Sequence, residues 1–196
     1  STLNISGSAD LTLDADSTIL DQATTINASS FTGDLTLASN NTSAAGAVTI
    51  TGGSGNDAIT LTGTNAATDT VNSGAGDDTI TFTAAQSELV DADVVNGGAG
   101  TDTLVGDSAD LVALTTANNI SNIEVIEAAN SFAAVTLTTA NIDSSIKSVT
   151  LAAGANAGTV TFGAGTNTLK LGTAAGGALT VNDTGLATND VLNITT

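Results

Sequence analysis

Residues 97–105 read GGAGTDTLV, and residues 52–60 read GGSGNDAIT. A third copy of the pattern G-G-x-G-x-D-x-U-x, where U is an aliphatic residue, occupies residues 73–81 and departs from it only by Ser73 in the first position. In each copy a glycine-rich stretch leads through an aspartate into alternating aliphatic and polar residues, which is typical of a tight turn followed by a short strand. The sequence therefore predicts three equivalent units of turn and strand.

The units recur with a period much longer than one strand. Aspartates precede successive strands at Asp10, Asp34, Asp57, Asp78 and Asp102, with steps of 24, 23, 21 and 24 residues. Such a period indicates a repeat architecture, in which each unit buries its apolar face only against adjacent units. We therefore expect an all-β fold: a right-handed parallel β-solenoid, similar to a β-roll or β-helix, with coils of 21–24 residues and the glycine turns along one edge.

The domain organisation follows from the same period. We expect residues 1–196 to form a single β-solenoid segment of a longer chain. Residues 83–90 have the spacing of a helical capping box and predict a short helical turn inserted in a loop. Residues 107–130 lack a clear repeat, and the sequence leaves two interpretations open there: a coil of different shape, or a junction between two solenoid segments.

The composition excludes most functional classes. The chain has 20 acidic residues, two lysines and no arginine, and its net charge of -18 argues against binding to nucleic acids or anionic membranes. Without His or Cys it lacks the usual zinc, iron and copper ligands and the Ser–His and Cys–His nucleophile pairs. No apolar run approaches the ~20 residues of a membrane span. We therefore expect neither an enzyme nor membrane insertion. A hydrophobic content of 41% argues equally against a disordered chain.

The glycine–aspartate turns carry the chemistry. Glycines let the backbone fold tightly around an ion, and turn carbonyls and a carboxylate are the hard oxygen ligands that Ca²⁺ prefers. A structural interpretation is also open, because any β-solenoid uses glycine-rich turns and aspartate is a common turn residue. Three copies in the same register favour a metal. The candidate calcium ligands are Gly53, Gly55, Asp57, Gly74, Gly76, Asp78, Gly98, Gly100 and Asp102.

Other polar positions near the repeats receive different interpretations. Asp10 and Asp34 lack the preceding glycines and are not expected to bind metal. Asp190 follows a degenerate turn and is a weaker candidate ligand than the motif aspartates. Asn167 replaces the acid in a turn that otherwise resembles the one at Asp102, so we expect no ion there. Asp69 and Asp93 share one offset before the second and third motifs, and the sequence allows both extra ligands and a solvated surface, of which it favours the surface.

The three motifs resemble the calcium-binding nonapeptide of the RTX family, a group of Gram-negative proteins exported by type I secretion. Thr-, Ala- and Asn-rich stretches such as residues 25–33, together with residues 122–127, resemble segments of bacterial S-layer proteins. The resemblance implies Ca²⁺ as the bound ion, secretion, and a place at the bacterial cell surface. The chain departs from the RTX toxins and proteases, which stack two nonapeptides in every coil, because each coil here holds one.

These expectations lead to a structural function. We expect a component of a bacterial cell-surface layer that folds and assembles on calcium binding, with copies of itself in a lattice or filament as partners. Cell-surface polysaccharide is a further expected partner, through regions outside this sequence. The alternative is a calcium-dependent spacer or RTX module of a secreted adhesin or enzyme. An ice-binding solenoid is a third interpretation, supported by the Thr-x-Thr pairs at Thr49/Thr51, Thr60/Thr62 and Thr79/Thr81 but opposed by their irregular placement.

Overall fold

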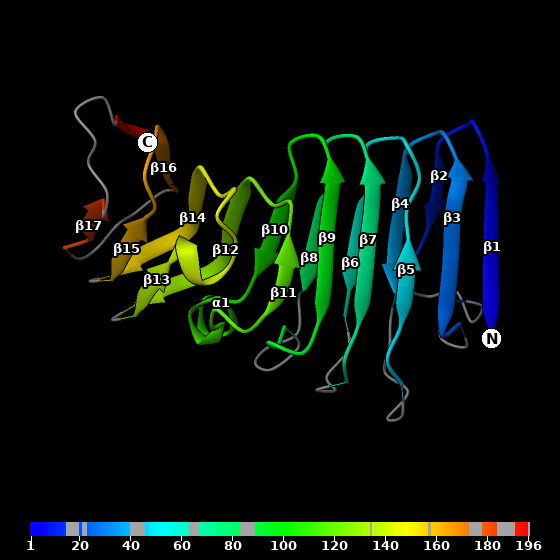
Figure 1. The fold of residues 1–196 in the computed structure, drawn as a ribbon, viewed down its shortest axis with the longest axis horizontal. Helices are drawn as coiled ribbons and strands as arrows, with labels where there is room; N and C mark the ends of the chain where they lie inside the picture. Colours follow the sequence, from blue (N-terminus) through cyan, green and yellow to red (C-terminus); the bar gives the residue numbers. More distant parts are fainter. Residues whose placement is uncertain are drawn as a thin grey trace.

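The computed structural model describes residues 1–14, 20, 23–39, 46–62, 67–82, 89–133, 135–156, 158–172, 178–183 and 191–195. Short strands dominate this part of the chain, and every strand pairing in it is parallel. Successive strands alternate between two faces and stack on their equivalents in the next repeat, so the molecule is a parallel β-solenoid (Figure 1). This confirms the expected fold class.

The strands form three sheets. Sheet A contains β1 (Thr2–Gly7), β3 (Thr25–Phe31), β5 (Thr49–Thr51), β7 (Thr70–Ala75), β9 (Val94–Ala99) and β11 (Asn119–Ser121). Sheet B contains β2 (Leu11–Leu13), β4 (Leu35–Ser39), β6 (Ala58–Leu61), β8 (Thr79–Phe82), β10 (Thr103–Gly106), β12 (Val125–Ala133), β14 (Ser148–Asn156), β16 (Asn167–Leu171) and β18 (Leu192–Thr195). Sheet C contains β13 (Thr136–Thr138), β15 (Thr159–Phe162) and β17 (Thr180–Asp183).

The handedness can be followed in Figure 1. The strands of sheet A run upward in front and those of sheet B run downward behind, while the chain advances from the N-terminal end on the right toward the left. This is a right-handed coil, the hand that the twist of strands favours for parallel connections.

The core consists of aliphatic columns, because alternation sends every second side chain of a strand inward. On sheet A, Ile26 aligns with Ile50, which aligns with Val71, and all three are fully buried. On sheet B the corresponding column runs from Leu13 through Leu37, Ile59, Ile80, Leu104, Ile126, Val149 and Leu169 to Ile194. All four phenylalanines of the chain are buried as well, so this narrow core is filled mainly by Ile, Leu and Val.

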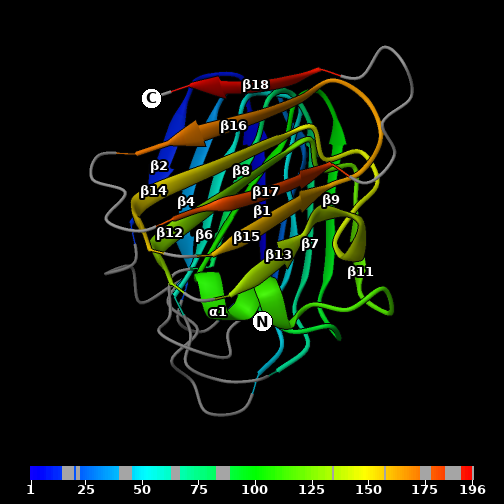
Figure 2. The ribbon, with the colours of Figure 1, turned by 90° about the vertical axis from the view of Figure 1, so that its left-hand side faces the viewer.

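At residues 107–130 one sheet of the solenoid continues and another is replaced. Strand β12 pairs with β10 on one side and β14 on the other, so sheet B runs through the region without a break. On the opposite side sheet A ends at β11 and sheet C begins at β13, so the region is also a junction. Figure 2 shows the strands of sheet C running in a different direction from those of sheet A.

The junction also contains the α-helix of the described residues, α1 (Ser108–Ala113), which the sequence analysis did not anticipate. Its N-cap is Asp107, whose carboxylate accepts a hydrogen bond from Ala109 N at 2.8 Å. A 3-10 turn, η2 (Thr139–Asn141), follows β13. The helical turn expected over 83–90 falls mostly on residues 83–88, which lie outside the described residues.

Few of the acidic residues lie in strands. Among the described strands only β12 and β17 carry one, at Glu127 and Asp183, and the other described acids lie in the connections or in α1. The Thr-x-Thr pairs are divided between the sheets, with Thr49 and Thr51 on β5 in sheet A and Thr79 and Thr81 on β8 in sheet B. The solenoid therefore has nearly neutral sheet faces and concentrates its negative charge along its edges.

Candidate metal centre

The strand register aligns the three motif aspartates. Asp57, Asp78 and Asp102 each precede a strand of sheet B by one residue, and Ala58, Thr79 and Thr103 are paired in neighbouring strands. The same register places Glu124 next in line, because Thr103 pairs with Val125. We call Asp57, Asp78, Asp102 and Glu124 the carboxylate column. The sequence analysis missed Glu124, since no glycine turn marks it, although its step of 22 residues from Asp102 fits the period.

The column corrects one alignment made from the sequence. Thr36 pairs with Ala58, so Leu35 lies beside Asp57, and Asp34 aligns with Asn56 instead. Asp34 and Asn56 belong to a separate, exposed ladder, in which Asn56 N donates to Asp34 Oδ1 at 2.8 Å and Asp77 N donates to Asn56 Oδ1 at 2.8 Å. Asp34 is therefore not equivalent to the motif aspartates, in keeping with its missing glycines.

One oxygen of each acid in the column binds the preceding coil. Asp57 N donates to Asp78 Oδ1 at 2.7 Å, Asp78 N donates to Asp102 Oδ1 at 2.9 Å, and Asp102 N donates to Glu124 Oε2 at 2.9 Å. Leu35 N donates in the same way to Asp57 Oδ1 at 2.9 Å. These bonds satisfy backbone donors at the point where each strand begins, and they tie neighbouring coils together.

The second oxygens differ between the turns. Asp57 Oδ2 accepts a hydrogen bond from Gly53 N at 2.8 Å. Asp78 Oδ2 and Asp102 Oδ2 are buried and have no hydrogen-bond partner. A buried polar atom left without a partner costs about 1–3 kcal/mol, and more when it carries charge. At Asp57 the Gly53 N–H group serves as the partner of Oδ2. Asp78 Oδ2 and Asp102 Oδ2 have no such partner, and a cation could take this place.

The raised pKa values of the three aspartates in the column also indicate that positive charge is missing there. Asp57, Asp78 and Asp102 are all at most 2% exposed. Burial raises the pKa of Asp57 and Asp78, and it raises the pKa of Asp102 to about 6. Backbone N–H groups partly oppose the shift, and at Asp78 the Ser73 hydroxyl opposes it as well. Neighbouring acids add to the rise, and no positive side chain lowers the pKa of any of the three. Ionised carboxylates stacked in this way need positive charge nearby.

The glycines of the motifs allow the turns to stack closely. Gly74, Gly76, Gly98 and Gly100 have φ angles of +113°, +125°, +97° and +141°, in the region that side chains rarely adopt. A side chain at Gly98 would also place its Cβ 2.0 Å from the Gly74 carbonyl oxygen, and one at Gly74 would lie 2.1 Å from the Gly53 oxygen. Gly53 and Gly55 do not have positive φ angles, but a Cβ at either would lie 2.2 Å from a carbonyl oxygen of the coil below.

The neutral turn shows what the acidic turns are missing. Asn167 continues the line of the column through Lys147 and is fully buried. Its amide Nδ2 donates to Gly163 O at 2.8 Å and to Gly165 O at 3.2 Å, the carbonyls four and two residues earlier. Lys147 Nζ donates to Ala164 O at 3.2 Å in the same turn. Here N–H groups donate to the turn carbonyls, and a carboxylate in that position has no N–H to donate. Asn167 Oδ1 is buried without a partner, as are Asp78 Oδ2 and Asp102 Oδ2.

The residues at Asp78 and Asp102 therefore fit a calcium ion better than those at Asp57. Each offers a buried carboxylate oxygen without a hydrogen-bond partner. No group of three or more acidic side chains converges among the described residues, so carbonyls would have to complete the coordination. The Gly53 oxygen lies against Gly74 of the next coil, and the Gly74 oxygen lies against Gly98. A bound ion that used these carbonyls would therefore sit where neighbouring coils are in contact.

A second buried pair lies on the sheet A side. Asp69 and Asp93 are 1% and 0% exposed, so the interpretation as a solvated surface is wrong. Val48 N donates to Asp69 Oδ1 at 2.7 Å and Asp69 N donates to Asp93 Oδ1 at 2.8 Å, which repeats the inter-coil bonding of the carboxylate column. Burial raises the pKa of Asp69 to about 6 and also raises that of Asp93. Asp190 lies outside the described residues.

Comparison with known proteins adds no family: no protein-family model, curated protein or solved structure matches the chain. The described residues contain no helix long and apolar enough to cross a membrane.

Proposed function

We propose that the chain is a calcium-stabilised structural solenoid of a secreted bacterial surface layer, which folds as Ca²⁺ binds in its turns and assembles with copies of itself. The observation that carries the proposal is the carboxylate column. It stacks the buried carboxyl groups of Asp57, Asp78 and Asp102 in successive coils, where no positive side chain lowers their pKa and where Asp78 Oδ2 and Asp102 Oδ2 have no hydrogen-bond partner.

Calcium suits these turns because it accepts carboxylate and carbonyl oxygens in flexible arrangements, whereas Mg²⁺ demands a stricter geometry and gives up its water reluctantly. Asp78 and Asp102 would hold the ion through Oδ2, with carbonyls of the adjoining glycine turns. When bound, the ion supplies the positive charge that the buried carboxylates lack. Asp57 would contribute less, since both of its oxygens already accept backbone N–H groups.

The charge distribution links the ion to folding. A chain of net charge -18 without cysteines has neither disulfides nor internal cations to hold it compact. Because the column forms only when the coils are stacked, the free energy of calcium binding adds to that of folding. Extracellular calcium modules bind at about 10⁻⁴–10⁻³ M. A chain of this kind is much less stable at low cytoplasmic calcium than at the calcium concentrations outside the cell.

The test compares circular dichroism and thermal melting in millimolar Ca²⁺, in millimolar Mg²⁺ and in excess chelator. We expect strand content and melting temperature to be highest in Ca²⁺, and electron microscopy to show ordered sheets or filaments only there. Identical melting in Ca²⁺ and chelator would remove the metal from the proposal. Calcium-dependent folding with dispersed particles in all conditions would favour the spacer module instead.

A further inference from the structure

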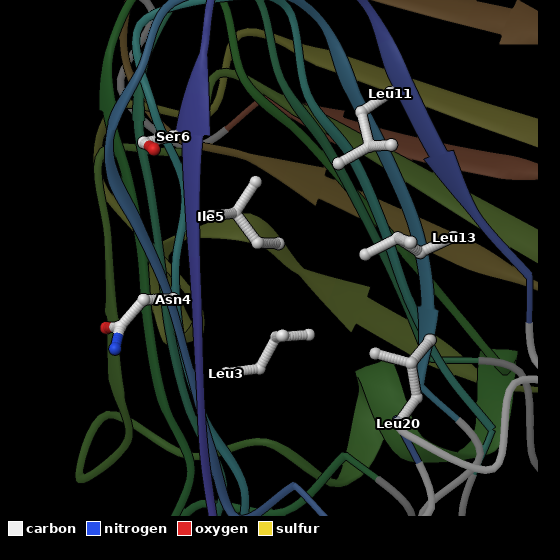
Figure 3. Close-up of a pocket in the computed structure, with 7 residues that line it drawn as sticks. All are labelled: Leu3, Asn4, Ile5, Ser6, Leu11, Leu13 and Leu20. Carbon is white, nitrogen blue, oxygen red and sulfur yellow. The ribbon is translucent and has the colours of Figure 1, made fainter.

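The inner faces of the strands are mainly aliphatic. Figure 3 shows this in the first coil, where Leu3 and Ile5 of β1 point toward Leu13 of β2 across a cavity of about 320 Å³. Asn4, between Leu3 and Ile5, points to the outer side of β1. A polar side chain on the inner side of a strand is therefore an exception, and its burial is costly unless a partner satisfies it.

Ser73 is such an exception. It follows Val71 by two residues on the inner side of β7, and both side chains are fully buried. It occupies the first position of its motif, where the other two motifs have Gly52 and Gly97. A Cβ at either glycine would lie 2.1 Å from a carbonyl oxygen of the next coil, so neither position has room for a side chain. Ser73 is thus the only buried hydroxyl residue in the three motifs.

The single hydrogen of the Ser73 hydroxyl already has an acceptor. Oγ lies 2.7 Å from Gly97 O and 3.5 Å from Asn96 O, so the hydroxyl donates to Gly97 O. The same hydroxyl is close enough to the Asp78 carboxyl group to oppose the rise of its pKa, yet Asp78 Oδ2 has no hydrogen-bond partner. The lone pairs of the hydroxyl oxygen therefore remain available beside an unpartnered carboxylate oxygen.

We propose that Ser73 is a calcium ligand, and that its hydroxyl oxygen binds the ion of the middle turn together with Asp78 Oδ2. This deepens the proposed function and rests on it. Hydroxyl and carboxylate oxygens are both hard ligands of the kind Ca²⁺ prefers. The hydrogen bond to Gly97 O fixes the hydroxyl so that it presents lone pairs to the ion instead of its hydrogen.

The proposal makes the two turns with unpartnered oxygens unequal. The motif of Asp102 has Gly97 in the first position and offers no hydroxyl there. Because the affinity of a calcium site depends on the number and charge of its ligands, the turn at Asp78 should bind more tightly and fill first. The alternative is a purely structural role, in which the Ser73 hydroxyl only ties β7 to β9 through Gly97 O.

The first test is isothermal titration of the full chain with Ca²⁺ in an Asp102→Asn background, which leaves the turn at Asp78 as the stronger site. Adding Ser73→Ala should raise the Kd about tenfold, because one ligand is lost. Ser73→Gly, the residue of the other two motifs, should do the same if the alanine variant does not fold. Unchanged affinity in either folded variant would overturn the ligand and leave the proposed function standing. Absence of calcium binding in the wild type would overturn both.

The second test separates a ligand from a structural hydroxyl by changing the preferred metal. Ser73→Cys keeps the size of the side chain but replaces a hard oxygen by a soft sulfur, in a chain that otherwise has no cysteine. It should lose affinity for Ca²⁺ and gain affinity for Cd²⁺, a softer ion of nearly the same size. Cd²⁺ should therefore raise the melting temperature of Ser73→Cys more than that of the wild type.

Ser121→Cys, at an exposed serine of β11, is the control for the thiol itself. An exposed thiol binds Cd²⁺ in the folded and the unfolded state alike, so Cd²⁺ should stabilise this variant no more than the wild type. Its calcium affinity should equal that of the wild type. If Ser73→Cys loses calcium affinity but Cd²⁺ stabilises it no more than Ser121→Cys, the hydroxyl of Ser73 is structural and the proposal is wrong.

Discussion

Replacing Asp102 by asparagine should stabilise the metal-free protein and weaken its response to calcium. The variant keeps Oδ1, which accepts the hydrogen bond from Asp78 N at 2.9 Å. It replaces the unpaired Oδ2 by an amide that can donate to turn carbonyls, as Asn167 does to Gly163 O and Gly165 O. The substitution therefore removes a buried charge and adds the donors that the acidic turn lacks.

The magnitude follows from the pKa. Burial raises the pKa of Asp102 from 3.8 to about 6, so at neutral pH the ionised group costs about 3 kcal/mol of unfolding free energy relative to a neutral side chain. A chain of this size gains roughly 2–4 °C in melting temperature for each kcal/mol. In excess chelator we therefore expect Asp102→Asn to melt roughly 6–12 °C above the wild type. In 1 mM Ca²⁺ the variant loses one site, which is worth about 1.4 kcal/mol at a Kd of about 10⁻⁴ M.

The assay is differential scanning calorimetry of wild type and variant in chelator and in Ca²⁺, with calcium stoichiometry from isothermal titration. Asp69→Asn is the matched control, since Asp69 is also buried with a pKa raised to about 6 but lies outside the glycine turns. It should raise the melting temperature in chelator and leave the calcium increment unchanged. If Asp102→Asn melts below the wild type in chelator, or keeps the full calcium increment, the assignment of Asp102 to a metal is wrong.

Three further outcomes test other parts of the structure. In chelator, the unfolding free energy of the wild type should rise as pH falls through about 6 and should level off near 3.8. The reason is that the pKa values of Asp69 and Asp102 are about 6 in the folded state and 3.8 in the unfolded state, so the folded state binds protons more tightly. Melting temperatures that fall steadily over this pH range would contradict this expectation. Gly98→Ala, at φ +97° and with a Cβ 2.0 Å from a carbonyl oxygen, should lower the unfolding free energy by at least about 3 kcal/mol in urea titrations, while Gly163→Ala, which has open space, should change it by less than about 1 kcal/mol. Leu104→Ala, at a fully buried core position, should cost about 2–5 kcal/mol in the same assay with calcium stoichiometry unchanged.

The repeat and the chemistry of the turns could be predicted from the order of the amino acids. Alternation of aliphatic and polar residues is a local property, so the strands at residues 58–61, 79–82 and 103–106 could be read directly from it. The glycines before Asp78 and Asp102 likewise indicated tight turns, and four of them have positive φ angles. A period of more than 20 residues then required parallel stacking, because connections of that length return each strand to the same edge of its neighbour.

Which residues meet across the coils could not be predicted and became visible in the folded molecule. The spacing of equivalent positions varies, so counting residues cannot fix a register: Asp34 lies 23 residues before Asp57 yet aligns with Asn56, and Glu124 joins the column without any motif. Register depends on how side chains from neighbouring coils pack, which is a non-local property. The burial of Asp69 could not be predicted for the same reason, because it depends on the coil that packs over this residue. The change from sheet A to sheet C is also non-local, because it depends on which strands pair.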